Sequence, residues 1–269
     1  LLFNTASEWK RDKMGEWDYI NNKEGVNKVL KSRVDECAPF ENVYTLALRG
    51  LHDRAMNASN NMDDRKKMLQ EALMAQRQML VDAIGKRAED IPQAFTPYKE
   101  VLDVYDQGLE LPDDVTIIWP DDNYGYMKRL SSPKEQKRSG RSGVYYHSSY
   151  LGKPHDHLWM NTTSPTLMYE ELRKAYDMTA DRIWLLNAGD IKSCEFAVDY
   201  FLTMAFDIDS FNFERAANYR TEWLCGMLGD DYRTEYQDVI NSFYKLAFAR
   251  KPEFMGWGYQ WATDKHGSE

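Results

Sequence analysis

Residues 115–123 have the sequence VTIIWPDDN, and this stretch decides the class of the fold. Its first five residues are mostly β-branched or aromatic, which predicts a β-strand. The polar residues Asp121, Asp122 and Asn123 follow where this strand would end. In a parallel sheet, polar residues after a strand mark the carboxyl edge, where α/β proteins build their sites.

Short β-type runs also lie before and after this strand in the sequence. Segments with apolar residues at helical spacing separate most of them. Because strands alternate with helices, the pattern predicts a mostly parallel sheet of the α/β class. The other predicted strands are residues 42–48, 93–98, 144–147 and 182–187, and the predicted helices are residues 23–36, 62–84, 166–178 and 195–206.

Polar residues follow each of the five predicted strands. In a TIM-type (β/α) barrel the loops after the strands build the active site, whereas a doubly wound sheet binds its ligand through one or two loops at a switch point. Five polar strand ends therefore favour the barrel. Since only five strands are visible, we expect an incomplete barrel, with earlier strands upstream or within residues 1–40. The strand-end residues are Arg49, Asp53, Glu100, Asp121, Asn123, His147, Asn187 and Asp190.

The β pattern stops after about residue 208, and residues 213–249 have helical spacing. We therefore predict a barrel domain over residues 1–208, truncated on its N-terminal side, and a helical region over residues 209–269. This region is either the start of a helical domain or a flank of the barrel. Residues 131–143 (SSPKEQKRSGRSG) predict a solvated loop, with a substrate-facing cationic loop as the alternative.

Charge and composition exclude several classes of partner. The net charge is −9 and no long basic run occurs, which argues against nucleic acid and against anionic membranes. No run of about 18 apolar residues is present, so we expect no membrane insertion. The three cysteines form neither a metal motif nor a disulfide framework. Glycine-rich phosphate loops, zinc-protease motifs and serine-hydrolase motifs are also absent from the sequence.

The remaining inventory of carboxylates, amides, tyrosines and one histidine suits acid–base hydrolysis of a polar substrate. Glycoside cleavage needs one carboxylic acid to protonate the leaving oxygen and a second carboxylate on the opposite face. Asp53 and Glu100, which follow successive strands, could supply this pair. Their separation would distinguish inversion from retention.

Each of these residues also has a purely structural interpretation. Asp53 could cap a turn or a helix, and Glu100 could be an ordinary first-turn carboxylate. Arg49 could form an ion pair with one of the acids, and His147 could be a hydrogen-bonded core histidine. A bound cation at Asp121, Asp122, Asn123 and Asp190 is a further alternative, although the spacing of an EF-hand loop is missing.

Four long segments resemble glycoside hydrolase family 115. They are NVYTLALRGLHD (42–53), IPQAFTPYKEVLDVYDQGLELPDDVTIIWPDDNYGYMKRL (91–130), GVYYHSSYLGKP (143–154) and RIWLLNAGDIKSCEFAVDYFLTMAFD (182–207). Their order and spacing also match, and the resemblance covers roughly residues 16–210. It implies an α-glucuronidase that removes glucuronic acid, often 4-O-methylated, from α-1,2 linkages on xylan with inversion of the anomeric carbon.

The resemblance also implies roles for individual residues. Glu100, in PYKE, matches the general acid, and Asp53, in RGLHD, matches the carboxylate that activates water. Arg49 matches a substrate-binding arginine, suited to a forked contact with the uronate carboxylate. Polar positions around the sugar match Tyr98, Asp121, Asn123, Tyr145, His147, Tyr150 and, more weakly, Asn187. The resemblance implies neither a metal nor a cofactor.

The chain matches only part of such a protein. Family members are larger, with domains before and after the barrel, and two of their upstream pocket positions have no counterpart here. The resemblance therefore implies an incomplete pocket, and it leaves open whether the isolated chain is active. It further implies glucuronoxylan as partner, a homodimer through the helical region of the full-length protein, and secretion or a periplasmic location. Two rivals stay open: a non-catalytic glycan-binding barrel homologue, and a hydrolase or lyase of another uronate-containing polysaccharide.

Overall fold

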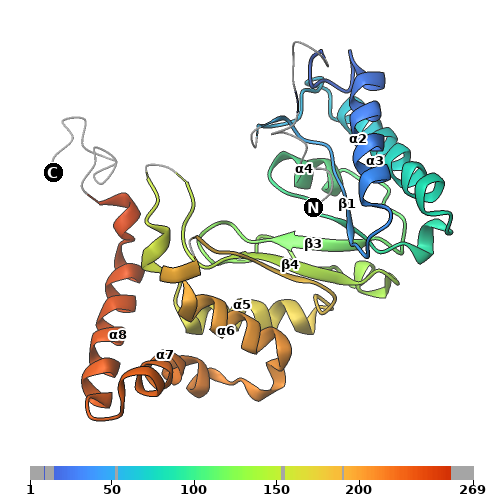
Figure 1. The fold of residues 1–269 in the computed structure, drawn as a ribbon. Coiled ribbons are helices and arrows are strands. Elements are labelled where there is room, and N and C mark those ends of the chain that lie inside the picture. The colour runs from blue at the N-terminus through green and yellow to red at the C-terminus, as the bar shows by residue number, and fades with distance from the viewer. Residues whose placement is uncertain (1–8, 10–14, 52–53, 153–154, 190, 256–269) are drawn as a thin grey trace, which may run out of the picture. The chain divides into compact units, whose positions relative to one another are not determined.

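The computed structural model describes residue 9 and residues 15–51, 54–152, 155–189 and 191–255 (Figure 1). The chain divides into two compact units. Unit 1 comprises residues 1–119 and 132–142, and unit 2 comprises residues 120–131 and 143–269. The boundary predicted between residues 208 and 209 stays a prediction.

Unit 1 alternates helices with short strands. Strand β1 pairs in parallel with β2, and β2 pairs in parallel with β3. Helix α3 connects β1 to β2, and the short helix α4 connects β2 to β3. The elements are α2 (Lys23–Cys37), β1 (Tyr44–Leu46), α3 (Met62–Ile84), β2 (Gln93–Phe95), α4 (Glu100–Asp106) and β3 (Thr116–Pro120, whose last residue belongs to unit 2), with 3-10 turns at Ala88–Asp90 and Glu135–Lys137.

Helix α3 has clear start and stop signals in its sequence. The side chain of Asn61 accepts hydrogen bonds from the backbone N–H groups of Asp63 and Asp64. Gly85, at a φ of 72°, ends the helix in the left-handed conformation that glycine adopts at little cost.

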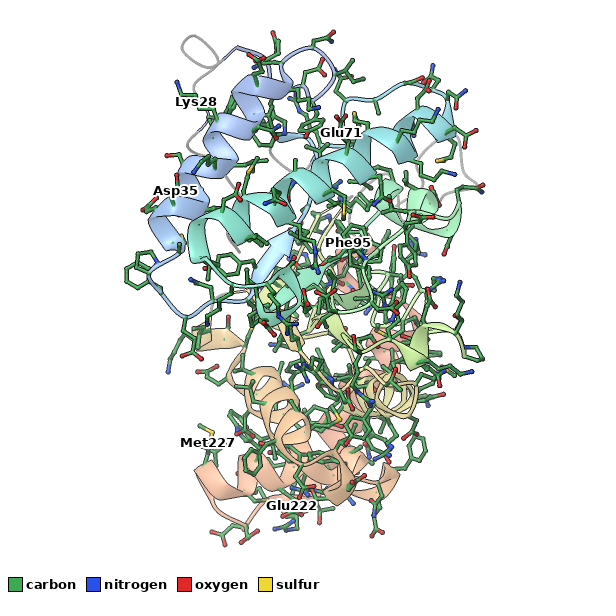
Figure 2. All side chains as sticks on the ribbon, turned by 90° about the vertical axis from the view of Figure 1, so that its right-hand side faces the viewer. Lys28, Asp35, Glu71, Phe95, Glu222 and Met227 are labelled. Carbon is green, nitrogen blue, oxygen red and sulfur yellow. The ribbon has the colours of Figure 1, made fainter. Side chains whose placement is uncertain are left out.

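Helices α2 and α3 lie side by side in unit 1, and each buries one apolar face (Figure 1). The polar faces point outward: Lys28 and Asp35 on α2 and Glu71 on α3 are exposed to solvent (Figure 2). The buried side chains include Val26, Leu30 and Val34 of α2 and Leu69, Leu73 and Leu80 of α3.

Unit 2 contains a second parallel strand pair and a larger helical layer. Strands β4 and β5 pair in parallel over four residues, from Val144 opposite Trp184 to His147 opposite Asn187. Helices α5 and α6 lie together beside these strands, and α7 packs against them (Figure 1). The elements are β4 (Ser142–His147, whose first residue belongs to unit 1), α5 (Pro165–Asp177), β5 (Trp184–Asn187), α6 (Glu195–Phe206), α7 (Phe213–Leu228) and α8 (Arg233–Ala249), with 3-10 turns at Leu158–Met160, Ile191–Ser193, Ile208–Ser210 and Pro252–Phe254.

The core of unit 2 joins the inner face of β4 to the helices. Tyr146 is fully buried against Phe201 of α6, and its hydroxyl donates to the carbonyl of Gly125. On α7, Ala216 belongs to this core and Tyr219 and Trp223 pack against it, whereas Glu222 and Met227 are exposed (Figure 2).

The prediction of a parallel α/β fold is confirmed. The strands follow chain order across the sheet, β1-β2-β3-β4-β5, and the described pairings are parallel. Sequential parallel strands joined by helices are the repeating element of a (β/α) barrel, and five strands correspond to an incomplete one. No helix in the described parts of the chain is long and apolar enough to cross a membrane.

The helical spacing of residues 213–249 is divided between α7 and α8, because Gly229 adopts a φ of 95° and ends α7. One local prediction differs from the structure. Within the predicted solvated loop, Arg138 is largely buried and its guanidinium donates to the carbonyls of Leu111, Pro112 and Val115. This cation therefore fixes the entry to β3 instead of facing solvent.

Candidate functional site

A forked ion pair lies beyond the carboxyl ends of β1 and β2 in unit 1. Arg49 follows β1 by three residues, and Glu100 is the first residue of α4. Nε of Arg49 lies 3.2 Å from Oε1 of Glu100, and its second guanidinium nitrogen lies 3.2 Å from Oε2. Both side chains keep 18% of their surface exposed, so the pair is shielded but reachable. Arg49 therefore forms an ion pair with one of the predicted acids, Glu100, as its structural interpretation predicts.

Aromatic and backbone groups surround the pair. The ring of Tyr98 lies 5.3 Å from the Arg49 guanidinium carbon and 5.0 Å from Nζ of Lys99, within range of cation–π attraction. Lys99 has a φ of 51° and a ψ of −123°, a combination unfavourable for any residue with a Cβ. This strained residue turns the chain immediately before Glu100.

The described residues in the segment from Arg49 to Asn57 form the rest of this cluster. The backbone N–H of Met56 donates to Oε1 of Glu100 at 3.1 Å, so the carboxylate has a second donor besides Arg49. The N–H of Gly50 donates to the carbonyl of Arg54 at 3.0 Å. A Cβ on Gly50 would lie 2.4 Å from the carbonyl oxygen of Ala55, so only glycine fits there. Asp53, the predicted water-activating residue, lies outside the described residues.

A buried acid–histidine pair occupies the ends of β3 and β4 in unit 2. Nδ1 of His147 lies 2.6 Å from Oδ1 of Asp121, and the His147 backbone N–H donates to Oδ2 at 3.1 Å. The side chains are 2% and 0% exposed, respectively. Asp121 therefore fixes the imidazole ring, as expected for a hydrogen-bonded core histidine.

Tyr145 and Asn187 extend this cluster to a partly exposed position. The amide nitrogen of Asn187 donates to the Tyr145 hydroxyl at 2.6 Å, and the Tyr145 ring lies 4.9 Å from the His147 ring. Because adjacent strand residues point to opposite faces, Tyr146 instead enters the core. Of the two tyrosines, Tyr145 is thus the candidate for ligand contact.

Asn123 and Tyr150 belong to the loops after β3 and β4. Asn123 adopts a φ of 67° and donates to the carbonyl of Leu151. The ring of Tyr150 packs against those of Tyr124 and Phe254, at 4.7 and 5.3 Å. Burial, together with the hydroxyl of Tyr124, raises the pKa of Tyr150 to about 12, so the phenol stays protonated at neutral pH.

The structure thus assembles the predicted residues within each unit. Arg49, Tyr98 and Glu100 cluster in unit 1; Asp121, Tyr145, His147 and Asn187 cluster in unit 2, with Asn123 and Tyr150 in the neighbouring loops. Among the described residues, no three His, Cys, Asp or Glu side chains come together as metal ligands. Asp190, part of the cation alternative, lies outside the described residues.

Sequence reasoning missed three side chains that support the unit 1 cluster. Gln76 of α3 bonds both backbone groups of Ala47, next to the end of β1. Trp17 and Asp18 contact the two ends of the segment from Arg49 to Asn57. Their stretch of sequence has no clean period, so only its unusual content of aromatic and acidic residues could have drawn attention to it.

Unit 2 also has a cavity of about 1030 Å³ between α5, α8 and the loop after β3. Tyr124, Leu167, Phe213, Tyr244 and Lys251 are among the side chains that line it. Burial lowers the pKa of Lys251, although the charges of Glu253 and Asp122 oppose this change. The predicted site residues do not line this cavity, so it is separate from the cluster around Asp121 and His147.

Comparison with known proteins gives one family. The family model described as "Glycosyl hydrolase family 115" matches residues 1–254. The solved structure described as "A novel family GH115 4-O-Methyl-alpha-glucuronidase, BtGH115A, with specificity for decorated arabinogalactans" is 42% identical, with a TM-score of 0.88. The similarity covers 94% of this chain and 33% of that one, so the chain spans about a third of its length. No curated protein matches significantly. The chain therefore belongs to glycosyl hydrolase family 115.

Proposed function

We propose that the full-length protein is a glycoside hydrolase that removes glucuronic acid or its 4-O-methyl derivative from α-1,2 linkages on glucuronoxylan, with inversion. Family membership supports glycoside chemistry. The observation that carries the assignment is the forked pair of Arg49 and Glu100 at successive strand ends. It combines a cation for a uronate with a carboxyl group for acid catalysis.

Arg49 and Glu100 would exchange partners when substrate binds. The uronate carboxylate is the same kind of group as the Glu100 carboxylate, so it can form the same two hydrogen bonds to the guanidinium. Substrate would thereby displace Glu100 from Arg49. Glu100, released from Arg49, would then be available as the proton donor to the glycosidic oxygen.

The reaction balances as a single displacement. Glu100 gives its proton to the glycosidic oxygen while the bond from that oxygen to the anomeric carbon breaks. Water attacks the same carbon from the opposite face and loses its proton to Asp53. The products are the free uronic acid, inverted at its anomeric carbon, and the polysaccharide, which carries a hydroxyl group at the cleaved position. We propose that Tyr98, Asp121, Asn123, Tyr145, His147, Tyr150 and Asn187 surround the sugar, with the Asp121–His147 pair holding Tyr145 in place.

One specific finding supports a second polysaccharide as the substrate: BtGH115A is described as having specificity for decorated arabinogalactans. We therefore propose two assays of the full-length protein, on glucuronoxylan and on uronate-decorated arabinogalactan. Release of glucuronic acid from xylan supports our proposal. Release from arabinogalactan alone would show that arabinogalactan, and not xylan, is the substrate. The anomer first formed, followed by NMR, tests inversion. An unsaturated product would indicate a lyase, and binding without release a glycan-binding homologue.

The role of Glu100 is tested by Glu100→Gln in the full-length protein. Glutamine keeps the size of the side chain but cannot supply the proton, so we expect kcat on polysaccharide to fall by about 10² to 10⁴-fold. The loss should shrink on an aryl α-glucuronide whose leaving group needs no protonation. Glu110→Gln, at an exposed carboxylate beyond α4, is the matched control. Near-normal turnover of polysaccharide by Glu100→Gln would show that Glu100 is not the general acid.

Two further proposals concern the whole protein. We propose a homodimer through the helical region that contains α7 and α8. We also propose that the enzyme works outside the cytoplasm, where a polysaccharide substrate is accessible.

A further inference from the structure

Two consecutive residues before α2 contact the segment that carries Arg49. The indole N–H of Trp17 donates to the carbonyl oxygen of Arg49 at 2.6 Å. Trp17 is itself fixed edge-to-face against Trp9, with ring centroids 4.9 Å apart. The Trp9 indole in turn donates to the carbonyl of Gly15. The backbone of Arg49 is therefore held by a side chain that is locked in its own packing.

Asp18 holds the other end of the same segment. Its side chain is buried, and Oδ2 accepts hydrogen bonds from the amides of Asn21 and Asn57 at 2.6 and 2.7 Å. Oδ1 accepts from the backbone N–H groups of Ile20 and Asn21. Burial alone would raise the pKa of Asp18, but these four donors outweigh it and lower the pKa. Asp18 is thus a charged, fully hydrogen-bonded anchor at neutral pH.

Asn57, the residue that Asp18 holds, lies next in the chain to a residue that contacts Glu100. Met56, its neighbour in the chain, donates its backbone N–H to Oε1 of Glu100 at 3.1 Å. Between the two anchored ends, the N–H of Gly50 bonds to the carbonyl of Arg54 and closes the segment on itself. Trp17 fixes the Arg49 end and Asp18 fixes the Met56–Asn57 end. Arg49 and Met56 both donate to the Glu100 carboxylate.

We propose that Trp17 and Asp18 are positioning residues, which set the place of Arg49 and Glu100 by clamping both ends of the segment from Arg49 to Asn57. This inference rests on the proposed function. Neither residue needs to touch the sugar. Since a misplacement of about 1 Å can cost about 100-fold in rate, a side chain that fixes the segment can control turnover from a distance.

A charge exchange across the Asp18–Asn57 contact tests the clamp in the full-length protein. Asn57→Asp places two carboxylates against each other, so the contact should open and Met56 should withdraw from Glu100. We expect kcat to fall by about 10-fold or more, by the same positioning argument. The pH profile of kcat/KM should also depart from the native one, because the Glu100 carboxylate loses the backbone N–H donor of Met56.

The double variant Asp18→Asn with Asn57→Asp restores one donor and one acceptor in exchanged places, and the exposed Asn21 amide, which also donates to Oδ2 of Asp18, can turn its oxygen toward the new amide. We expect it to recover kcat to within about threefold of the native value, together with the native pH profile. Asn60→Asp adds the same charge three residues away at an exposed position and serves as the control. Native kcat and pH profile in Asn57→Asp, or no recovery in the double variant, would overturn the clamp. So would recovery of thermal stability in the double variant without recovery of the pH profile, because a purely structural contact predicts that result.

A measurement without substrate separates this inference from the proposed function. Trypsin cleavage after Arg54 in the native protein, followed by mass spectrometry, reports on how firmly the segment is held. We expect faster cleavage in Asn57→Asp and native rates in the double variant. If the native enzyme released no uronic acid, the proposed function would fail, but this pattern would still support the clamp. Equal cleavage rates in all variants would refute it.

Discussion

At the scale of single residues, burial distinguishes the carboxylates of this chain. Asp121 is enclosed with His147, whereas Asp209 forms an ion pair with Arg173 but keeps 76% of its side chain exposed. A buried carboxylate loses its hydration and depends on its protein donors, while an exposed one exchanges them for water. The same kind of side chain should therefore have very different effects on stability at these two positions.

We predict that Asp121→Asn lowers the free energy of unfolding by about 2–4 kcal/mol, because the amide presents a donor where Nδ1 and two backbone N–H groups need acceptors. Asp209→Asn, the matched control, should cost at most about 1 kcal/mol. Urea unfolding of both variants measures the difference. Equal losses would show that the Asp121–His147 contact contributes no more than a surface pair.

The sequence placed most candidate residues but not their partners. The hydrophobic strands that precede Arg49 and Glu100 predict that both follow strand ends. Their pairing depends on two backbone features between strand and side chain, the close approach at Gly50 and the positive φ of Lys99. A lysine in that conformation has no sequence signal, because its strain is balanced by surrounding contacts. For the same reason, the sequence alone could not show whether Arg49 forms an ion pair with one of the acids.

At the scale of elements, helix α3 was predicted with its observed bounds, whereas β1 is shorter than its hydrophobic run. The helix has a capping asparagine before it and a glycine after it, both local signals. The end of β1 depends on a distant residue: beyond Leu46, the backbone of Ala47 bonds to the side chain of Gln76 rather than to β2. Such a contact between a helix and a strand cannot be seen in either segment alone.

Gln76 therefore gives a prediction at this scale. Its fully buried amide donates to the Ala47 carbonyl and accepts from the Ala47 N–H. Gln76→Leu keeps the volume but leaves both backbone groups unsatisfied, which should cost about 2–4 kcal/mol of unfolding free energy. Gln78→Leu, at an exposed position of the same helix, should change it by less than about 0.5 kcal/mol. Denaturant unfolding tests both, and a Gln76→Leu loss below 1 kcal/mol, about one ordinary hydrogen bond, would contradict the prediction.

At the scale of the whole molecule, the order of parallel strands follows from local patterns, because each βα repeat has its own hydrophobic run and its own polar end. The division into two units does not follow from them. Residues 132–142 belong to unit 1 although unit 2 contains residues on both sides of them. Arg138 shows why residues 132–142 join unit 1. Its guanidinium donates to three backbone carbonyls around the entry to β3, although its sequence context predicts a solvated side chain.

The proposed homodimer leads to a prediction about α8. Tyr232, immediately before this helix, and Val239 and Leu246 within it are spaced seven residues apart, so they share one face, and each is at least 61% exposed. Soluble proteins rarely leave such apolar rows uncovered. We expect the full-length protein to sediment as a dimer, and Val239→Glu to shift it to a monomer, because two copies would bury the new charge. Thr234→Glu adds the same charge at an exposed polar position of α8 and should leave the dimer intact. Dissociation by Thr234→Glu as well, or a dimer that tolerates Val239→Glu, would place the interface elsewhere.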